Sequence, residues 1–348
     1  MHTFDLVVVG SGGGPSETNI SAYLLKERAL SWEDGIVALE AGSGVGALQK
    51  ILDKNPDMLG SSGEKHTAAQ IYSFVRAYVI THTHLDHVLG LVLLAGAFVG
   101  QRRRLMGSMQ TLKDLESIFR PSRIWPNLAS WNENDADFLY LYDPLYHDEQ
   151  YRDVNGNISV RMMPISHGSN PVPYESSAFF VRHKTSMKEF LFFGDVEPDS
   201  ISSNPQTIKV WRSVAPMIPD RLNTIFIECS WPSGREDAEL FGHLSPKHLA
   251  DELENLAAEV VKTREISAGP SKSTSDSPAR KKVKLAPKAP TQPLKGLRVY
   301  VMHFKEDMES VYDRPIHEVI TEQVRDLVAE KKLGVEILCA EQGMRIQI

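Results

Sequence analysis

His82-Thr83-His84-Leu85-Asp86-His87 is the most informative stretch of this chain, because it places four metal-ligating side chains within six residues. Three imidazoles and one carboxylate at this spacing serve no ordinary purpose in a protein core or on a protein surface. A chance histidine-rich turn is the alternative interpretation. It is disfavoured because further histidines and an aspartate that could bind a metal follow along the chain. The stretch therefore predicts a metal site.

The neighbouring residues predict the local structure of this cluster. An apolar run at 74–80 has the character of a strand, and the run at 88–95 has that of a helix. His82 and His84 on an extended segment point the same way, because side chains alternate along a strand. Asp86 and His87 then fall where the helix starts. Two ligand sets facing slightly different points favour two adjacent cations, and neutral imidazole suits zinc, iron or manganese.

Composition limits the class of protein. The chain has 348 residues, of which 42% are hydrophobic, which is enough for one large domain or two smaller ones. The formal net charge of -7 gives no general attraction to nucleic acid, so no nucleic-acid partner is expected. The two cysteines, Cys229 and Cys339, fit a reducing cytoplasmic compartment. We expect no signal peptide and no membrane span, because the N-terminus lacks a basic region and no apolar run is long enough.

The opening run at residues 6–15 is rich in glycine and imitates a dinucleotide-binding fingerprint. Pro15 stands where that fingerprint needs a small residue, and no clean strand-helix-strand unit with an acidic residue follows. A glycine-rich hairpin, or a loop that lines a cleft, is the better interpretation.

Strand-like runs recur along the chain, and several end on a residue with chemical function. We expect strands at residues 35–40, 158–165, 189–193, 223–227, 297–302 and 335–339. Four of these runs are followed by His167, Asp195, Glu228 and His303. Reactive groups at the carboxyl ends of strands are a common way to build a site on a sheet. This regularity is stronger evidence for a site than any one of its residues.

Two helices and two insertions are also expected. Ser245-Pro246 supplies an N-cap and a proline at the first helical position, and a second helix begins near Pro315. Residues 102–157 are charged and turn-rich, which predicts an insertion that forms a cap or an oligomer contact. Residues 268–295 predict a flexible, basic, low-complexity insertion. Its segment 280–284 is a nuclear import signal or, in the preferred interpretation, a solvated charged loop.

Three residues far from the cluster are candidate ligands. Asp195 follows a strand-like run that contains three phenylalanines. An unpaired carboxylate would be costly to bury there without a cation. A bridge between two metals explains it. His303 follows an apolar run in the same way. Gly168 permits close backbone approach beside His167, which favours a ligand over an ordinary polar residue.

His243 lies just before the predicted helix N-terminus at Ser245. Free backbone N–H groups and the positive end of the helix dipole bind anions there. This position predicts that His243 and Ser245 grip a substrate phosphate, or that His243 acts as a general acid. A simple helix-capping loop is an equally weighted alternative.

In chain order, the H-x-H-x-D-H cluster followed by His, Asp and His resembles the metallo-β-lactamase fold superfamily. The resemblance implies an α+β fold over residues 1–348, an αββα sandwich with a dinuclear metal site at one edge of the sheets. It also implies the ligands: His82, His84 and His167 on one metal, Asp86, His87 and His303 on the other, and Asp195 between them.

A narrower resemblance is to the class II cyclic-nucleotide phosphodiesterases. Residues 82–93 resemble the signature of that family, and so do residues 242–246 and 13–19. The resemblance implies metal-dependent hydrolysis of cAMP, and of cGMP, to nucleoside 5′-monophosphates by a hydroxide shared between two divalent ions. Zinc is favoured over manganese or iron.

This resemblance implies catalytic roles for Asp86, Asp195 and His243. Ala95-Gly96 departs from the end of the family signature, at positions where metal binding should be unaffected. Glu40 stands where members of the wider superfamily often carry Asp, which puts one contact beside the ligands in question.

Substrate and partners are less defined than the metal site. Trp125, Trp131 and Trp231 are candidates for stacking on a purine base. A homodimer through residues 102–157 is compatible with the sequence. Two alternatives stay open: another hydrolase of the same fold, such as an RNA-processing phosphodiesterase or a thioesterase, and a metal-free interaction module. The second is disfavoured because every expected ligand is present.

Overall fold

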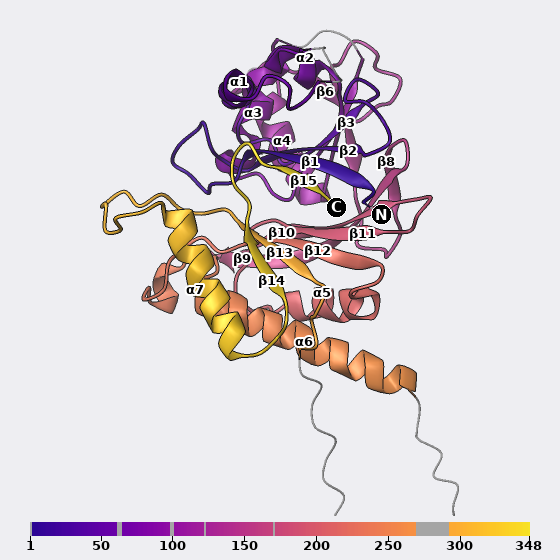
Figure 1. Cartoon of the computed structure of the whole chain (residues 1–348). Helices are drawn as coiled ribbons and strands as arrows, with labels where there is room; N and C mark the ends of the chain where they lie inside the picture. The colour runs from indigo at the N-terminus through magenta and orange to yellow at the C-terminus, as the bar shows by residue number, and fades with distance from the viewer. Residues whose placement is uncertain (1, 61–64, 98–100, 122, 170, 269–291) are drawn as a thin grey trace, which may run out of the picture.

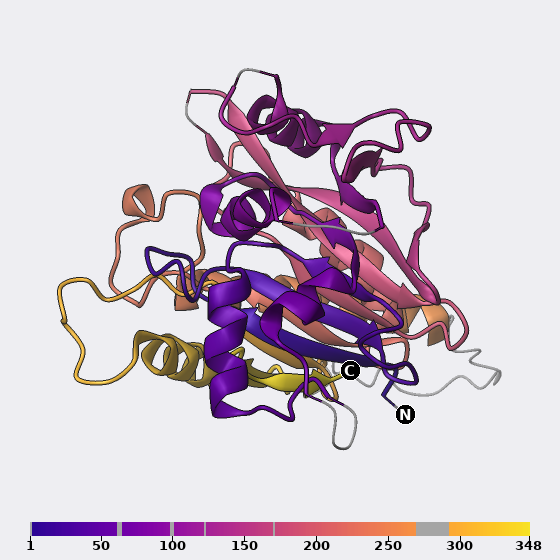
Figure 2. The same cartoon turned by 90° about the horizontal axis from the view of Figure 1, so that it is seen from above.

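A computed structural model describes residues 2–60, 65–97, 101–121, 123–169, 171–268 and 292–348. In this part of the chain two sheets pack face to face, and helices cover both outer faces (Figure 1). Figure 2 looks down onto the helices that cover the first sheet. The predicted αββα sandwich of the α+β class is confirmed.

The first sheet consists of β1 (Phe4–Gly10), β2 (Ala22–Glu27), β3 (Ile36–Leu39), β4 (Val75–Val79), β5 (Arg103–Gly107), β6 (Ala129–Ser130), β7 (Tyr140–Pro144) and β15 (Arg345–Gln347). Its strand order is β15-β1-β2-β3-β4-β5-β7-β6. The strands from β3 to β7 pair in parallel, whereas β1 pairs antiparallel with β2 and β15. The N and C termini therefore lie side by side (Figures 1 and 2).

The second sheet consists of β8 (Arg152–Asn155), β9 (Ile158–Ser169), β10 (Pro173–His183), β11 (Glu189–Phe193), β12 (Leu222–Glu228), β13 (Arg298–Met302) and β14 (Glu336–Cys339). Its strand order is β14-β13-β12-β11-β10-β9-β8. The neighbours β11, β12, β13 and β14 are parallel. Their carboxyl ends consequently lie at one edge of the sheet. Glu228 is the last residue of β12, and Asp195 and His303 lie just after β11 and β13.

Four helices cover the first sheet: α1 (Val45–Lys54), α2 (Ala68–Ser73), α3 (Leu85–Ala95) and α4 (Met109–Phe119). Three cover the second: α5 (Thr207–Val214), α6 (Pro246–Ala268) and α7 (Ile316–Glu330). The 3-10 segments η1 (Ala215–Met217) and η2 (Asp237–Glu239) complete the described helical elements. Both sheets are covered on both faces, which explains why their strands read as continuous apolar runs.

The apolar core lies in three layers that follow from this arrangement. Side chains of β1 illustrate it, because Val7 packs toward the helices while its neighbours Leu6 and Val8 pack between the two sheets. A third cluster, which includes Trp211 on α5, lies between the second sheet and its helices. Alternate side chains of β1 therefore pack into two different apolar clusters, one on each face of the first sheet.

Two insertions were predicted, at residues 102–157 and at residues 268–295. Residues 102–157 do not form a separate cap, because they supply β5, β6, β7, β8 and α4 and extend both sheets. The predicted insertion at 268–295 falls mostly at residues 269–291, which lie outside the described residues, and the segment 280–284 lies there too. Within the described residues, no helix has both the length and the apolar character needed to cross a membrane.

Candidate metal centre

The first sheet presents the histidine cluster from a strand end and a helix start, as predicted. His82 and His84 follow β4, and α3 begins at the next residue, so Asp86 and His87 lie in its first turn. Gly90 fixes this helix in place: its N–H donates to the Gly42 carbonyl at 2.7 Å. A Cβ at Gly90 would meet backbone oxygens at 2.8–2.9 Å, so only glycine allows this approach.

The second sheet brings the distant candidates to the same place. Asp195 follows β11, and His303 follows β13, at the carboxyl ends of parallel strands. His167 differs from the prediction, because it lies inside β9, which continues to Ser169. The strand does not end before His167 because its pairing with β10 extends to Ser169 opposite Pro173.

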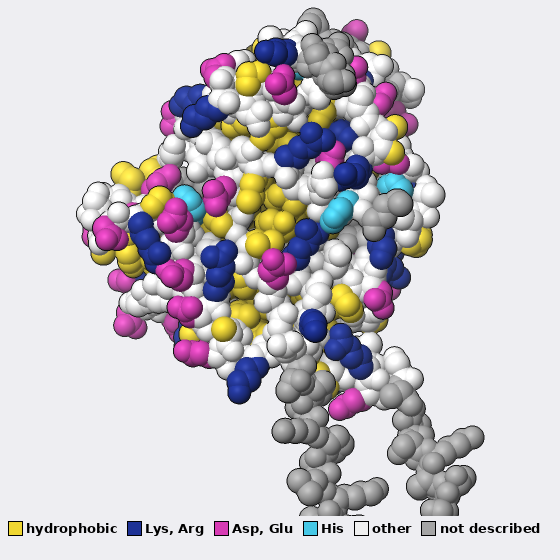
Figure 3. Space-filling model, in the orientation of Figure 1, with side chains coloured by type: hydrophobic (Ala, Val, Ile, Leu, Met, Phe, Trp, Pro, Cys, Tyr) yellow, Lys and Arg dark blue, Asp and Glu magenta, His cyan; other side chains and the backbone are white. Residues whose placement is uncertain are grey.

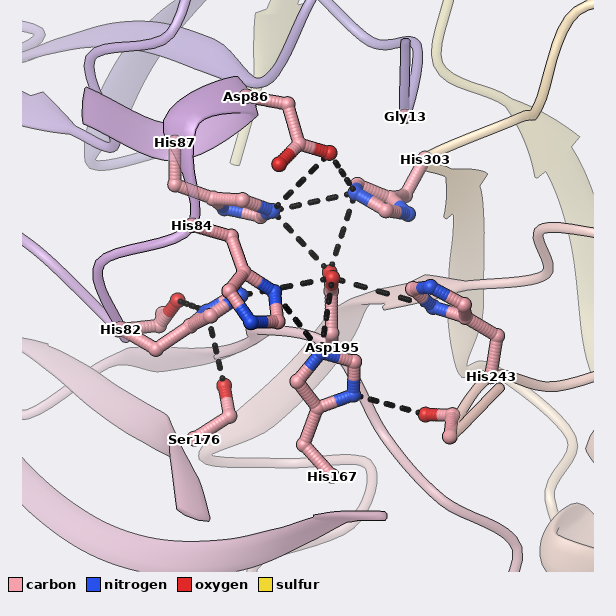
Figure 4. A network of polar contacts seen from close by, with 12 residues as sticks. Gly13, His82, His84, Asp86, His87, His167, Ser176, Asp195, His243 and His303 are labelled. Atoms are coloured by element: carbon pink, nitrogen blue, oxygen red, sulfur yellow. Dashed lines mark hydrogen bonds and ion pairs between the residues drawn. The ribbon is translucent and has the colours of Figure 1, made fainter. Parts of the chain in front are cut away.

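One group of side chains that could hold a metal consists of His82, His84, His167 and Asp195. The Nε2 atoms of His82 and His167 each lie 3.5 Å from Oδ2 of Asp195. His167 Nε2 and His84 Nδ1 are 3.2 Å apart. Figure 4 shows these rings turned toward Asp195, which occupies the centre of the cluster.

A second such group consists of Asp86, His87, His303 and again Asp195. Oδ1 of Asp195 lies 3.3 Å from His87 Nε2 and 3.2 Å from His303 Nε2. The two imidazole nitrogens are 3.1 Å apart, and Asp86 Oδ2 is 3.2 Å from that of His303. The two groups use different oxygens of Asp195, so this carboxylate lies between them (Figure 4).

These distances are those of ligands around a common cation. Four atoms placed 2.0–2.1 Å from a tetrahedral zinc lie about 3.3 Å from one another. His82 Nε2 and Asp195 Oδ1 are buried and have no hydrogen-bond partner among the described residues. Such atoms are costly unless something pairs with them. The arrangement fits a metal-binding site.

Electrostatics decide which of these side chains are neutral and which are charged. Burial lowers the pKa of His82 well below its usual range and lowers that of His167 to about 4, so both rings are neutral near pH 7 and offer a lone pair. Burial opposes ionisation of Asp195, but the imidazoles of His303, His87 and His82 outweigh it and hold the pKa of that carboxyl well below its ordinary value. Burial opposes protonation of His87, but the carboxylates of Asp195 and Asp86 outweigh it and raise the pKa of that ring well above its usual range. His82 and His167 thus offer lone pairs, whereas His87 must lose a proton before it can bind a metal.

Hydrogen bonds to the far ring nitrogens orient these histidines. His82 Nδ1 lies 2.9 Å from the Thr81 hydroxyl and 3.3 Å from the Ser176 hydroxyl. The Gly242 carbonyl accepts from His167 Nδ1 at 2.8 Å, which favours the Nδ1–H tautomer and leaves the lone pair of Nε2 available for a metal. Such contacts are typical of metal-ligating histidines.

The other two rings are fixed in the same way. His303 Nδ1 lies 2.9 Å from the Ser230 hydroxyl, and the ring packs on Gly13, where a Cβ would come within 2.6 Å. His87 Nδ1 is 3.5 Å from Oε2 of Glu40. Glutamate at position 40 therefore contacts His87 as an ion-pair partner, although neither of these two atoms has a hydrogen bond among the described residues. Glu40 and His303 both have left-handed backbones, with φ of 60° and 62°, a strain that is typical of functional sites.

His243 lies beside the cluster and is held by a buried glutamate. Its Nδ1 is 2.9 Å from Oε1 of Glu228 and 3.8 Å from Oδ2 of Asp195. Burial lowers the pKa of His243 to about 4. Burial, reinforced by the charge of Asp195, raises the pKa of Glu228 to about 7. The other oxygen of Glu228 accepts from the Ser230 hydroxyl at 2.6 Å, so one carboxyl positions both His243 and the partner of His303.

Ser245, predicted as a phosphate contact, is not part of this cluster. Its buried hydroxyl lies 2.8 Å from Nδ1 of His248, three residues along α6. The predicted start of the helix at Pro246 is confirmed.

Two participants were not recognised from the sequence. Glu228 was noted at a strand end, but its contact with His243 joins residues 15 positions apart, so no local sequence pattern signals it. Lys305 Nζ lies 2.6 Å from the Gly13 carbonyl and 3.8 Å from Asp86 Oδ2. No local pattern pointed to Lys305, because the left-handed backbone of His303, with a φ of 62°, ends the strand alternation before residue 305.

The chain is similar to proteins of one family. The model of the class-II cAMP phosphodiesterases matches residues 49–343. A 3′,5′-cyclic-nucleotide phosphodiesterase of Schizosaccharomyces pombe is 31% identical over 269 residues, which cover 72% of this chain and 75% of the relative.

Solved structures show the fold. The structure of unliganded yeast PDE1 superposes with a TM-score of 0.80 at 23% identity and covers 100% of both chains. YhfI of Bacillus subtilis, a metallo-β-lactamase fold protein, has a TM-score of 0.56 at 12% identity and covers 99% of this chain and 100% of its own. The two-sheet sandwich described above is therefore similar to the metallo-β-lactamase fold.

Proposed function

The chain belongs to the class-II cAMP phosphodiesterases, and from that premise we propose that it hydrolyses 3′,5′-cyclic nucleotides to nucleoside 5′-monophosphates in a metal-dependent reaction. The observation that carries the proposal is the convergence of six candidate ligands from both sheets on a seventh, the carboxylate of Asp195. cAMP is the principal substrate. cGMP is included, because the cluster acts on the cyclic phosphate, which both nucleotides share.

The proposed site holds two divalent ions. His82, His84 and His167 would hold one, Asp86, His87 and His303 would hold the other, and Asp195 would offer an oxygen to each. A set of imidazoles and carboxylates without a thiolate suits zinc best, with manganese or iron as the alternatives. When bound, the ions would supply a water of lowered pKa as nucleophile and neutralise charge on the phosphoryl oxygens.

The remaining side chains act on the leaving group. Opening the ring frees the 3′ oxygen, which needs a proton. With Nδ1 of His243 held by Glu228, Nε2 is the nitrogen left for the substrate. A proton from the Glu228 carboxyl can pass to Nδ1 while the Nε2 proton passes to the 3′ oxygen, since the pKa of Glu228 is raised to about 7. The Lys305 ammonium, 3.8 Å from Asp86, adds positive charge beside the phosphate.

Incubation of the purified chain with cAMP tests this proposal. We expect 5′-AMP as the product, resolved from 3′-AMP by chromatography, and a rate that falls to background after treatment with a chelator. Formation of 3′-AMP, or a rate unchanged by the chelator, would contradict it.

A structured RNA and a thioester serve as comparison substrates for the alternative hydrolases. The face shown in Figure 3 has basic and acidic side chains interspersed, without a continuous basic stripe on that face for an RNA backbone. A cytoplasmic location, nuclear import and a homodimer stay predictions.

A further inference from the structure

A cavity of about 800 Å³ opens directly beside the metal cluster. Two of the candidate ligands, His84 and His167, form part of its wall, so a molecule in it would have one end at the cations. This volume lies within the range of roughly 300–1,000 Å³ typical of small-molecule sites. It exceeds what a cyclic phosphate alone would fill.

The cavity has an apolar side that packing of the chain does not explain. Phe241 is 71% exposed and Val172 is 67% exposed, and both line the cavity. Tyr174, on the same wall, stacks on His84 with ring centroids 4.8 Å apart and an angle of 3°. Aromatic side chains that stay exposed beside a polar site offer flat surfaces on which the ring of a ligand can stack.

The backbone holds Phe241 in this position. Phe241 has a φ of 52°, which is unfavourable for a residue with a bulky side chain. The next residue, Gly242, has a φ of 80° and packs against the His167 backbone, where a Cβ would come within 2.9 Å. Its carbonyl also accepts from His167. The segment that contacts His167 therefore also sets the backbone of Phe241 at the cavity wall.

A carboxylate faces the same space. Glu197 is half-buried in the cavity wall, and its carboxylate makes no hydrogen bond or ion pair with the described residues. Asp237 lies at the rim, 3.4 Å from His248. An acceptor without a protein partner, in a cavity with both apolar and polar walls, is suited to a ligand that donates hydrogen bonds.

On the basis of the proposed function, we propose that this cavity binds the purine base of the cyclic nucleotide, with Phe241 as the stacking surface and Glu197 as the acceptor for an exocyclic amine. Adenine and guanine both carry such an amine. None of the predicted stacking residues Trp125, Trp131 and Trp231 is among the described residues that line the cavity. Trp131 packs instead on Tyr142, at a centroid distance of 4.6 Å.

Kinetics of Phe241→Ala test the stacking role. Base–aromatic stacking is worth a factor of roughly 5 to 100 in affinity, so we expect KM for cAMP to rise about tenfold with little change in kcat. The base-free probe 1-deoxyribose 3′,5′-cyclic phosphate should be hydrolysed equally by variant and wild type. Phe241→Trp should restore KM. Tyr146→Ala, an exposed aromatic residue outside the cavity lining, is the matched control and should change nothing.

A KM for cAMP within twofold of wild type in Phe241→Ala would overturn the stacking assignment, as would an equal loss with the base-free probe. Binding of 5′-AMP, measured by calorimetry, separates this proposal from the proposed function. If the wild type hydrolyses no cyclic nucleotide, the function fails, while about tenfold weaker 5′-AMP binding in Phe241→Ala would still support the cavity. Unchanged 5′-AMP binding would refute the cavity whatever the activity.

Glu197→Ala tests the acceptor role. Wild type should hydrolyse cAMP with a lower KM than the cyclic monophosphate of unsubstituted purine riboside, which lacks the amine. In Glu197→Ala the two KM values should become equal, because the group that distinguishes them is gone. A preference for cAMP that survives in the variant would contradict the assignment.

Discussion

Two buried charged clusters lie at opposite ends of β1, and they differ in how their charges are balanced. At the start of the strand, Asp5 pairs with three cations: Arg345 at 2.6 Å, Lys26 at 3.3 Å and Arg28 at 3.6 Å. Beyond its end, Asp195 faces imidazole nitrogens that are themselves acceptors when neutral. The first cluster balances its carboxylate with cations of the chain itself, so it stabilises the fold. The second needs a cation from outside, which is the property of a functional site.

Asp195→Asn should have the largest effect on function. An amide carries no charge and offers one acceptor oxygen, so it cannot bridge two cations. We expect zinc content to collapse, and cAMP turnover to fall by more than the roughly 100-fold that loss of an outer hydrogen-bond partner costs. Elemental analysis and 5′-AMP formation measure both. Asp5→Asn should retain full metal content. If Asp195→Asn also retained its metal, the claim that only the Asp195 cluster needs a cation would be contradicted.

Asp5→Asn should instead weaken the fold. Removing one partner of a buried ion pair costs about 3–5 kcal/mol, measured by urea unfolding. The control Asp143→Asn breaks a half-exposed pair with Arg104 and should cost about 1 kcal/mol or less.

This stability should depend on pH. Burial opposes ionisation of Asp5, but Arg345 and Lys26 outweigh it and lower its pKa in the folded chain. A lowered folded pKa stabilises the fold at pH values above the unfolded pKa of about 3.9, and this contribution is lost as the pH falls through the folded value. The gap between wild type and Asp5→Asn should therefore narrow below about pH 4. A gap that stays constant from neutral to acidic pH would count against the assignment.

Glu228→Gln separates positioning from metal binding within the second cluster. The variant keeps the shape of the side chain but loses the carboxyl that holds His243 and Ser230. We expect kcat to fall by roughly 10- to 100-fold with metal content retained. Glu252→Gln is the matched control, because Glu252 is equally buried but accepts from Trp211 on α5. Equal kcat values for the two variants would refute a catalytic contribution of Glu228.

Gly13→Ala should have the smallest effect. The added Cβ would come 2.6 Å from the His303 ring and displace it, which should weaken metal affinity by about tenfold in a chelator competition assay. Gly46→Ala places a Cβ in open space and should leave affinity unchanged. Identical affinities would show that His303 does not need its observed position.

The two halves of the metal centre also differed in how far the sequence could predict them. The cluster from His82 to His87 is local, so strand and helix periodicity place its side chains directly. Asp195 and His303 could be placed because parallel strands bring their carboxyl ends to one edge. His167 was expected after a strand and lies inside one, because the partner strand β10 begins with Pro173 and was not recognised.

Contacts set by loops could not be predicted. Glu228 meets His243 across fifteen positions of irregular chain, and Phe241 takes a left-handed backbone that no local pattern signals. Residues 102–157 were expected to form an inserted cap or an oligomer contact, because the segment is charged and turn-rich. The long parallel pairing of β7 with β5 makes them part of the sheet.

Metal titration of the chelator-stripped chain tests the central claim most directly. Zinc is added in steps while bound metal and 5′-AMP formation from cAMP are followed together. The account predicts no turnover without metal and saturation of both signals at two equivalents per chain. Turnover that survives stripping, or saturation at fewer than two equivalents, would contradict it.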